Sequence, residues 1–221
     1  MYSKRIRTLC SLLSRAESFA DIGCDHGYCS EYMLENDLCS RVTVTDISAE
    51  CLKKAQTLLR KYVDNGKCTP LCTDGLKGVD KNTDLVLIAG MGGMEIVQIL
   101  TAAEGFIPKN FVLQPMRDGE KVRKLLLDRG ACIRRDFTFF DGKFYDVITG
   151  SRDGGTPAYT QAELDFGREN IQNRSEEFLR FLQEEIKKRQ AVLTRPLGEY
   201  SREQSQAKLN YLQGVFSGEI K

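Results

Sequence analysis

The segment of residues 20–28 holds the residue types whose spacing says most about chemistry. Gly23 and Gly27 stand where a predicted strand turns into a helix, and glycines at such a turn let the backbone approach a bound nucleoside. A dinucleotide site would need another glycine near position 25, where backbone NH groups bind a pyrophosphate. This chain has Asp25 there, together with Asp21 at the end of the strand. The acidic turn therefore disfavours a phosphate and favours a cationic ligand.

Two further aspartates follow the next two predicted strands. Asp46 ends the run of residues 42–45, where an acidic residue can accept hydrogen bonds from both hydroxyls of a ribose. Asp74 follows the third strand, where a carboxylate can accept a hydrogen bond from the exocyclic amine of adenine. Each aspartate by itself could instead cap the helix that follows it. Their combination favours S-adenosylmethionine, an adenosine with a sulfonium and an ammonium group, and makes a dehydrogenase the least favoured interpretation.

A second glycine-rich turn, Ala-Gly-Met-Gly-Gly at residues 89–93, follows the fourth predicted strand. Three glycines among four residues make a wide turn that could admit a flat base or the sulfonium itself, although the turn could also serve only to pack a strand against a helix. The Asn-Pro-Pro-Tyr motif of many amino-methylating enzymes is absent from the sequence. Attack by an exocyclic nitrogen therefore lacks its usual signature.

These turns presuppose a doubly wound α/β fold, because short apolar runs alternate with longer helical patterns. The predicted strands cover 19–22, 42–45, 67–71, 85–89 and 111–113, and the predicted helices cover 27–36, 48–64, 93–103 and 117–128. An amphipathic helix after Ser3 opens the chain. Residues 132–149 change to two strands joined by Asp141-Gly142, which predicts a terminal antiparallel hairpin. The sheet is expected to have helices on both faces and a crevice at the carboxyl ends of its strands.

The last third of the chain has a different pattern. Residues 151–157 form the clearest linker, and apolar stripes beyond it predict a short helix from near Gln161 followed by an antiparallel helical pair, broken at residues 195–198. We therefore expect one domain over residues 1–152 and a helical domain over residues 153–221. The many charges of the second domain are interpreted as solvated helix surface, with a dedicated RNA clamp as the alternative.

The composition excludes some classes of function. Because 32 basic residues nearly balance 31 acidic ones, no strong overall field attracts a polyanion, and affinity for nucleic acid must come from local patches. The eight cysteines form no Cys-x-x-Cys pair and the chain has one histidine, so no metal site is expected and free thiols in a reducing cytoplasm are favoured. No apolar run approaches the roughly 20 residues that span a bilayer, so no membrane association is expected.

Taken together, the motifs resemble those of the bacterial tRNA (adenine-22-N1)-methyltransferases. The resemblance rests on Ser3-Lys4-Arg5-Ile6, residues 21–28, Asp74-Gly75-Leu76, residues 88–93, Leu113-Gln114-Pro115 and residues 141–145. It implies a Rossmann-like class I methyltransferase fold with a coiled-coil-like helical extension, S-adenosylmethionine as cofactor, and methyl transfer to N1 of adenine 22 in tRNA. A methyltransferase of another substrate and a non-catalytic tRNA-binding protein of the same fold are the alternatives. A monomer is expected, with a homodimer left open.

The same resemblance implies roles for individual residues. The expected donor-binding residues are Asp21, Gly23, Asp25, His26, Gly27, Asp46, Ile47, Asp74, Gly75 and Gly90. The residues expected around the reacting base are Met91 and Gly92, with His26 as a positioning group, and the expected substrate-binding residues are Lys4, Arg5, Arg7, Tyr28, Gln114 and Tyr145. Adenine N1 already has an in-plane lone pair, so the reaction needs positioning rather than a strong base. His26 could also be an ordinary hydrogen-bonded loop residue, and each aromatic ring, Phe144 included, could belong to the core.

Other basic residues are candidates for phosphate contacts, which carry little sequence preference. They are Lys53, Lys54, Arg60, Lys61, Arg117, Lys121, Arg123 and Lys124.

Overall fold

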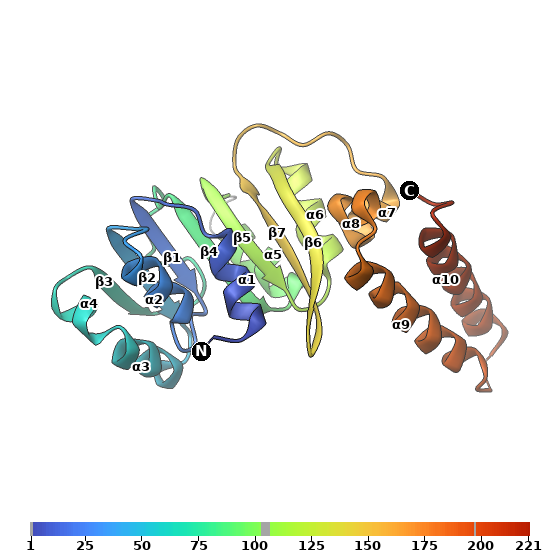
Figure 1. Cartoon of the computed structure of the whole chain (residues 1–221), viewed down its shortest axis with the longest axis horizontal. Coiled ribbons are helices and arrows are strands. Elements are labelled where there is room, and N and C mark those ends of the chain that lie inside the picture. The colour runs from blue at the N-terminus through green and yellow to red at the C-terminus, as the bar shows by residue number, and fades with distance from the viewer. Residues whose placement is uncertain (1, 103–106, 197) are drawn as a thin grey trace.

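The computed structural model describes residues 2–102, 107–196 and 198–221, and within these ranges the strands form one seven-stranded sheet of order β3-β2-β1-β4-β5-β7-β6 (Figure 1). The strands are β1 (Ser18–Ile22), β2 (Arg41–Asp46), β3 (Cys68–Cys72), β4 (Leu85–Met91), β5 (Asn110–Pro115), β6 (Cys132–Asp141) and β7 (Lys143–Ser151). The first five strands pair in parallel, and β7 runs antiparallel to both β5 and β6. The predicted doubly wound sheet with a terminal hairpin is confirmed.

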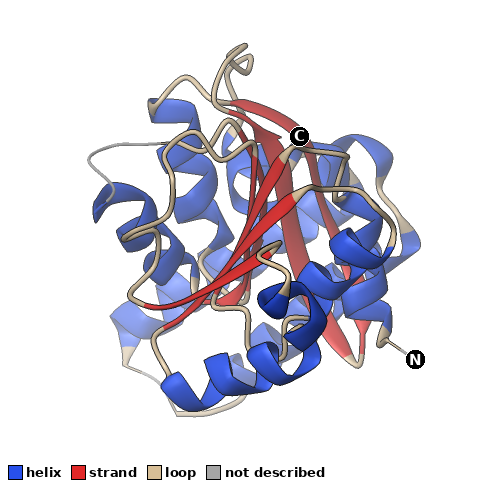
Figure 2. Ribbon diagram, turned by 90° about the vertical axis from the view of Figure 1, so that its left-hand side faces the viewer, coloured by secondary structure: helices blue, strands red, loops and turns tan. Residues whose placement is uncertain are grey.

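Helices cover both faces of this sheet (Figure 2). They are α1 (Lys4–Leu12), α2 (Tyr28–Glu35), α3 (Ala49–Leu58), α4 (Arg60–Asp64), α5 (Gly93–Ala102) and α6 (Gly119–Asp128). Because successive side chains of a strand point to opposite faces, Phe19 packs in one apolar cluster with α1, α2, α3 and α4, whereas Ile22 packs in another with α5 and α6. The carboxyl ends of the parallel strands stay open between these layers.

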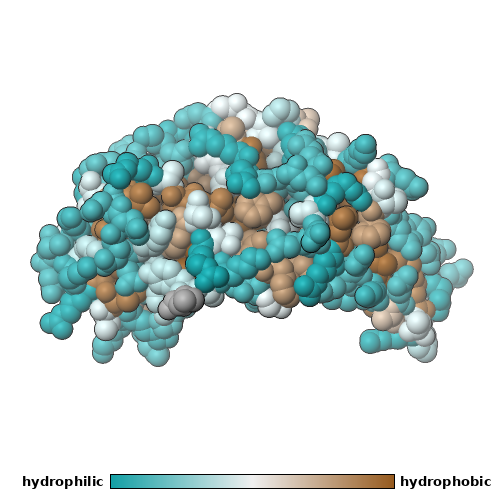
Figure 3. All heavy atoms as spheres, in the orientation of Figure 1, coloured by the Kyte–Doolittle hydropathy of each residue, from teal (hydrophilic) through white to brown (hydrophobic). Residues whose placement is uncertain are grey.

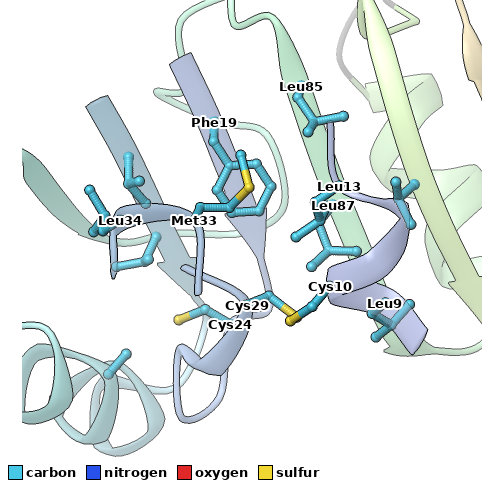
Figure 4. Packing of buried hydrophobic residues seen from close by; sticks show 14 of the residues in the cluster. Leu9, Cys10, Leu13, Phe19, Cys24, Cys29, Met33, Leu34, Leu85 and Leu87 are labelled. Carbon is cyan, nitrogen blue, oxygen red and sulfur yellow. The ribbon is translucent and has the colours of Figure 1, made fainter. Parts of the chain in front are cut away.

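The first of these clusters is unusually rich in thiols. Figure 4 shows Cys10 of α1 and Cys29 of α2 side by side, and Phe19 and Leu87 belong to the same apolar cluster. Both cysteines are buried, and neither is in a disulfide. Among the described residues, no group of three His, Cys, Asp or Glu side chains is placed to hold a metal ion.

One predicted helix is divided in the structure. The pattern of residues 48–64 forms two helices, because Leu59 leaves helical geometry between α3 and α4 and buries its side chain completely. The predicted helix over residues 93–103 corresponds to α5, which is described over Gly93–Ala102. Ala103, the last residue of that prediction, lies outside the described residues, as does Leu197 in the predicted break of the helical tail.

The tail consists of α7 (Gln161–Phe166), α8 (Arg168–Asn173), α9 (Glu176–Leu193) and α10 (Glu199–Ser217). Gly167, with a φ of 94°, separates the first two helices, and α9 and α10 form the predicted antiparallel pair beyond the β6 edge (Figure 1). The tail has its own apolar cluster around Phe178 and Leu182. The predicted domain division at residue 152 lies between β7 and α7 and stays a prediction.

The tail joins the sheet through aromatic and charged contacts. Phe181 of α9 packs edge-on against Phe144 of β7, with ring centroids 5.4 Å apart. Figure 3 shows hydrophobic residues where the tail helices meet the sheet, and further hydrophobic residues over the central part of the same face. No helix among the described residues is long and apolar enough to cross a bilayer.

Candidate active site

A cavity of about 1000 Å³ opens at the carboxyl ends of β1, β2 and β4 and at the loop after β3. It is lined by most of the predicted donor-binding residues: Asp21, Gly23, Asp25, His26, Asp46, Ile47, Asp74, Gly75 and Gly90. Of the residues expected near the substrate, Arg5, Tyr28 and Met91 also line it. The fold therefore brings together residues that are far apart in the sequence, such as Arg5 and Met91, which are separated by 86 positions. This is the edge at which open α/β sheets bind their ligands.

Gly27 lies outside the cavity and has a packing role. A Cβ atom at this position would lie 3.1 Å from Cβ of Ala55 and 3.2 Å from Cδ1 of Leu59, and the φ of Gly27 is +75°. The absent side chain lets the turn pack on α3. The predicted contact of Gly27 with the donor stays a prediction.

Asp21 is the most buried carboxylate of the cavity wall. It is 5% exposed, and its Oδ2 accepts a hydrogen bond of 2.8 Å from Oγ of Ser30. Burial raises the pKa of Asp21 to about 6, while the Ser30 hydroxyl and the charge of Arg5 act in the opposite direction. This side chain can therefore change charge close to neutral pH, according to what binds beside it.

Asp46 is positioned by two backbone donors. Its Oδ1 accepts from the Ser48 amide at 2.8 Å, and its Oδ2 accepts from the Asp25 amide at 3.3 Å. Ser48 itself caps α3, so Asp46 orients the turn before the cap rather than serving as the cap. Each carboxylate oxygen has a second lone pair, which leaves acceptors for the two hydroxyls of a ribose.

Met91 extends from β4 across to β1. Its terminal methyl group occupies the space that a Cβ atom on Gly23 would need, and Gly23 has a φ of +67°. The sequence suggested that Gly23 makes room for a nucleoside, and the structure adds that it makes room for the thioether of Met91. Register between β4 and β5 shifts between Ala89 and Met91, so the strand end bulges at this point.

The turn after β4 is held by a carboxylate that sequence reasoning missed. Oε2 of Glu95 accepts a hydrogen bond of 2.9 Å from the Gly92 amide, and Glu95 also lines the cavity. Glu95 lies three residues after Gly92, which is the spacing of the acidic residue in a capping box, although Gly92 lacks the hydroxyl of that motif. Gly93 donates at 2.8 Å to the carbonyl of Arg117, which ties the turn to the loop after β5.

Gln114 is fully buried and does not line the cavity. Its Oε1 accepts a hydrogen bond of 2.9 Å from Nε of Arg5, and its Nε2 donates to the carbonyl of Pro115 at 3.1 Å. Tyr145 is also buried, stacked on Phe139 with ring centroids 5.4 Å apart. Cζ of Arg5 lies 5.6 Å from the ring centroid of Tyr145, so both residues adjoin Arg5, and their predicted contacts with the substrate stay predictions.

Exposed aromatic rings stand at the mouth of the cavity. The rings of His26 and Tyr28 are stacked with centroids 5.3 Å apart and planes 11° from parallel. Tyr2 approaches Tyr28 at 5.5 Å and donates a hydrogen bond from its hydroxyl to Glu31. Tyr28 is 37% exposed, so part of its ring remains available to a ligand.

The basic candidates lie in different environments. Lys4 and Arg7 are exposed on α1, where Lys4 pairs with Glu177 of the tail at 2.7 Å and Arg7 donates to the Tyr2 carbonyl at 2.9 Å. The suggestion that Arg123 contacts phosphate is wrong, because its side chain is fully buried and paired with Asp136. The sequence of α6 did not show that Arg123 is buried, because exposed lysines stand close to it on the same helix.

Comparison with known proteins identifies the family of this chain. The family model described as tRNA (adenine(22)-N(1))-methyltransferase matches residues 19–216. The tRNA (adenine(22)-N(1))-methyltransferase of Bacillus subtilis is 30% identical over 169 residues, which are 75% of this chain and 71% of that protein. Two Mycoplasma proteins, from M. pneumoniae and M. genitalium, are 34% and 30% identical, and the match covers 58% and 57% of their respective lengths. The chain thus matches less than two thirds of each Mycoplasma protein.

Solved structures show the same fold. The structure of M. capricolum TrmK with S-adenosylhomocysteine has a TM-score of 0.90 at 21% identity and covers 100% of both chains. The B. subtilis m1A22 tRNA methyltransferase TrmK has a TM-score of 0.84 at 24% identity and covers 98% of this chain and 99% of its own. The similarity includes the helical tail.

Proposed function

Since this chain belongs to the tRNA (adenine(22)-N(1))-methyltransferase family, we propose that it transfers the methyl group of S-adenosylmethionine to N1 of adenine 22 in tRNA. The observation that carries the proposal is the acidic cavity at the carboxyl edge of the sheet, with Asp21, Asp46 and Asp74 on its wall. A cationic adenosine fits this wall better than a dinucleotide does, because a pyrophosphate would face several carboxylates.

The residues of the cavity suit the parts of this donor. Asp46 offers acceptors to the ribose hydroxyls and Asp74 to the adenine amine, while Asp21 supplies a negative charge for the ammonium group. The related M. capricolum protein binds S-adenosylhomocysteine, the product that remains after methyl transfer. We assign donor binding to the domain of residues 1–152 and place the helical domain of residues 153–221 beside it.

Methyl transfer to N1 needs positioning more than acid–base chemistry. The N1 lone pair forms a bond to the methyl carbon as the bond from carbon to sulfur breaks, so the sulfonium becomes a neutral thioether and the adenine ring becomes cationic. No proton has to leave before the attack. Met91 lines the cavity at the turn after β4, Gly92 follows it with its amide held by Glu95, and the carboxylates of Asp25 and Glu95 lower the energy of positive charge in the cavity.

The target base must leave any base pair, because N1 lies on the Watson–Crick edge. The stacked rings of His26 and Tyr28 offer a surface on which an extruded adenine can stack. We assign contacts with backbone phosphates to Lys4 and Arg7, which are exposed on the adjoining helix, and Lys4 would have to leave its ion pair with Glu177 for this contact. The cytoplasmic location and the monomeric state remain predictions.

Mass spectrometry of nucleosides tests the proposal. Unmodified bacterial tRNA is incubated with the purified chain and S-adenosylmethionine, and 1-methyladenosine is the expected product. No methylated nucleoside from any such tRNA would reject the proposal. Methylation of a protein or small molecule in the absence of RNA would favour the first alternative, and tRNA binding without donor affinity would favour the non-catalytic one.

A further inference from the structure

Arg5 brings a guanidinium group into the donor cavity and holds it there from several sides. Its backbone amide donates to Oδ2 of Asp141 at 2.8 Å, and its Nε donates to Oε1 of the buried Gln114 at 2.9 Å. Its Nη2 lies against the β4 turn, since a Cβ atom on Gly90 would stand 2.7 Å from it. Arg5 lines the cavity, and its head group is therefore directed inward, away from the exposed side of α1 that carries Lys4 and Arg7.

No ion pair neutralises this guanidinium among the described residues, although its charge acts on the buried carboxyl group of Asp21. Over residues 2–102, 107–196 and 198–221, its hydrogen-bonding partner is the neutral amide of Gln114, and no carboxylate forms an ion pair with it. A guanidinium has five NH donors, and Nε accounts for one of them. A half-buried cation with unused donors is costly unless a ligand supplies an anion.

Charged groups of both signs line the cavity, with Lys77 and Lys81 beside Asp74 after β3 and Glu95 beside the turn after β4. The carboxylates of Asp46 and Asp74 follow β2 and β3, which is the side proposed for the adenosine part of the donor. Arg5 faces the end of β4, beside the turn at which the methyl group is transferred. The amino-acid end of the donor belongs on this second side, because it adjoins the sulfur that carries the methyl group.

We propose that Arg5 binds the α-carboxylate of the methyl donor, an inference that rests on the proposed function. The acidic wall satisfies the two positive groups of S-adenosylmethionine and repels its carboxylate, so the carboxylate needs a cation of its own. The planar fork of a guanidinium matches a carboxylate with two parallel hydrogen bonds. Gln114 acts as a positioning residue, since it fixes Nε and leaves the two terminal nitrogens free for this contact.

The experiment is calorimetry on the full chain without RNA, with two ligands. One is S-adenosylhomocysteine, and the other is its decarboxylated analogue, which keeps the adenosine, the thioether and the amine. The wild-type chain is expected to bind S-adenosylhomocysteine about tenfold to hundredfold more tightly than the analogue, the range for hydrogen bonds to a charged group. Arg5→Met is expected to abolish this preference, and Arg5→Lys to retain part of it, because lysine keeps the charge and loses the fork.

Arg15→Met is the matched control, because Arg15 is exposed and does not line the cavity, and it should keep the full preference. Wild-type protein that binds neither ligand would overturn the donor site itself. Wild-type preference that persists in Arg5→Met would overturn the role of Arg5 while the donor site stands. If a folded Arg5→Met lost affinity for both ligands equally, this result would also overturn the proposal, in favour of a structural role of Arg5. If Arg5→Met does not fold, the preference of Arg5→Lys decides, and an undiminished one would contradict the proposal.

Discussion

Two regions of the molecule bury carboxylates, and they treat the charge differently. At the contact between sheet and tail, Asp136 is 2% exposed and its two oxygens each accept from Nε of Arg123 at 3.0 Å. Nη2 of the same arginine donates to Asp146 at 2.9 Å. In the donor cavity, Asp21 is 5% exposed and has the hydroxyl of Ser30 as its partner. In the first region the buried carboxylates are paired with an arginine of the same chain. In the second region the buried carboxyl group has a neutral hydroxyl as its partner, and we propose that it faces a ligand.

The closed region is a structural joint. Nη1 of Arg123 also donates to the carbonyls of Leu164 and Asp165 at 3.3 Å, so one side chain of α6 holds the end of α7. Such a network is satisfied in the free protein and has no further capacity for a ligand. Both regions are buried, and they differ in charge pairing: the carboxylates that fix the tail have an arginine partner, whereas Asp21 in the donor cavity has none among the described residues.

The largest expected effect comes from breaking the joint. Arg123→Met leaves Asp136 and Asp146 without their counter-charge, and removal of one partner from a buried ion pair costs about 3–5 kcal/mol. Denaturant unfolding measures this loss. Lys124→Met, on the same helix with a side chain that is 64% exposed, should change the free energy of unfolding by less than about 0.5 kcal/mol. A loss below about 1 kcal/mol for Arg123→Met would show that the joint does not depend on charge pairing.

The next effect concerns the open region. Asp46→Ala removes both acceptors proposed for the ribose and should weaken S-adenosylhomocysteine binding about 50-fold, since hydrogen bonds to a charged group contribute about 1.5–3 kcal/mol. Calorimetry measures the affinity, and thermal unfolding checks that the turn before α3 survives. Asp64→Ala, at an exposed ion pair of α4, is the control. An unchanged affinity in Asp46→Ala would remove its assigned role.

A smaller effect follows from the titration of Asp21. Its pKa of about 6 lies above the usual value of a carboxyl group, so the folded state retains a proton between about pH 4 and pH 6 that the unfolded chain has lost. The stabilising contribution is complete below about pH 4 and disappears as the pH rises through 6. Asp21→Asn should therefore stabilise the chain by about 2 kcal/mol more at pH 7.5 than at pH 4, in denaturant unfolding.

Donor binding should show the opposite trend. The ionised Asp21 attracts the ammonium group, so the affinity of the wild-type chain for S-adenosylhomocysteine should rise between pH 5 and pH 7. In Asp21→Asn this rise should disappear. An identical pH profile for the two proteins would separate Asp21 from the bound donor.

The smallest effect is expected at the surface pair that links α1 to the tail. Lys4 and Glu177 are 46% and 40% exposed, and exposed pairs contribute about 0.5 kcal/mol because solvent screens them. A double-mutant cycle of Lys4→Ala and Glu177→Ala isolates the pair, since Glu177 also accepts from the Phe140 amide at 3.3 Å. A coupling above about 2 kcal/mol would make this pair a second joint between the tail and the sheet.

The sequence was sufficient for features that depend on local order along the chain. The carboxylates of Asp21, Asp46 and Asp74 could be placed at the carboxyl edge of the sheet. Each lies at or just after the end of a strand, and parallel strands end at the same edge. The β6–β7 hairpin was predictable from Asp141-Gly142, and Gly142 has the positive φ of 72° that such a turn requires. Chain order and turn chemistry therefore predicted the sheet and the acidic residues at the carboxyl ends of its strands.

The remaining features depend on contacts between distant segments. Arg5 and Gln114 are 109 positions apart, and no local pattern shows that α1 delivers a guanidinium to β5. Arg123 looks like its exposed neighbours, and its burial follows from Asp136 and the end of α7. Gly27 belongs to the predicted donor-binding turn, but in the structure it packs against α3 outside the cavity. In each case tertiary packing decided the role of a residue whose type was compatible with several.

The most direct test of the open cavity as a methyl-transfer site uses two transcripts of one tRNA that differ at position 22. The chain is incubated with S-adenosylmethionine and either the adenosine-22 or the guanosine-22 transcript, and the methylated nucleotide is located by mass spectrometry. The account predicts one methyl group at N1 of adenosine 22 and none in the guanosine-22 transcript. Equal methylation of both transcripts, or of neither, would contradict it.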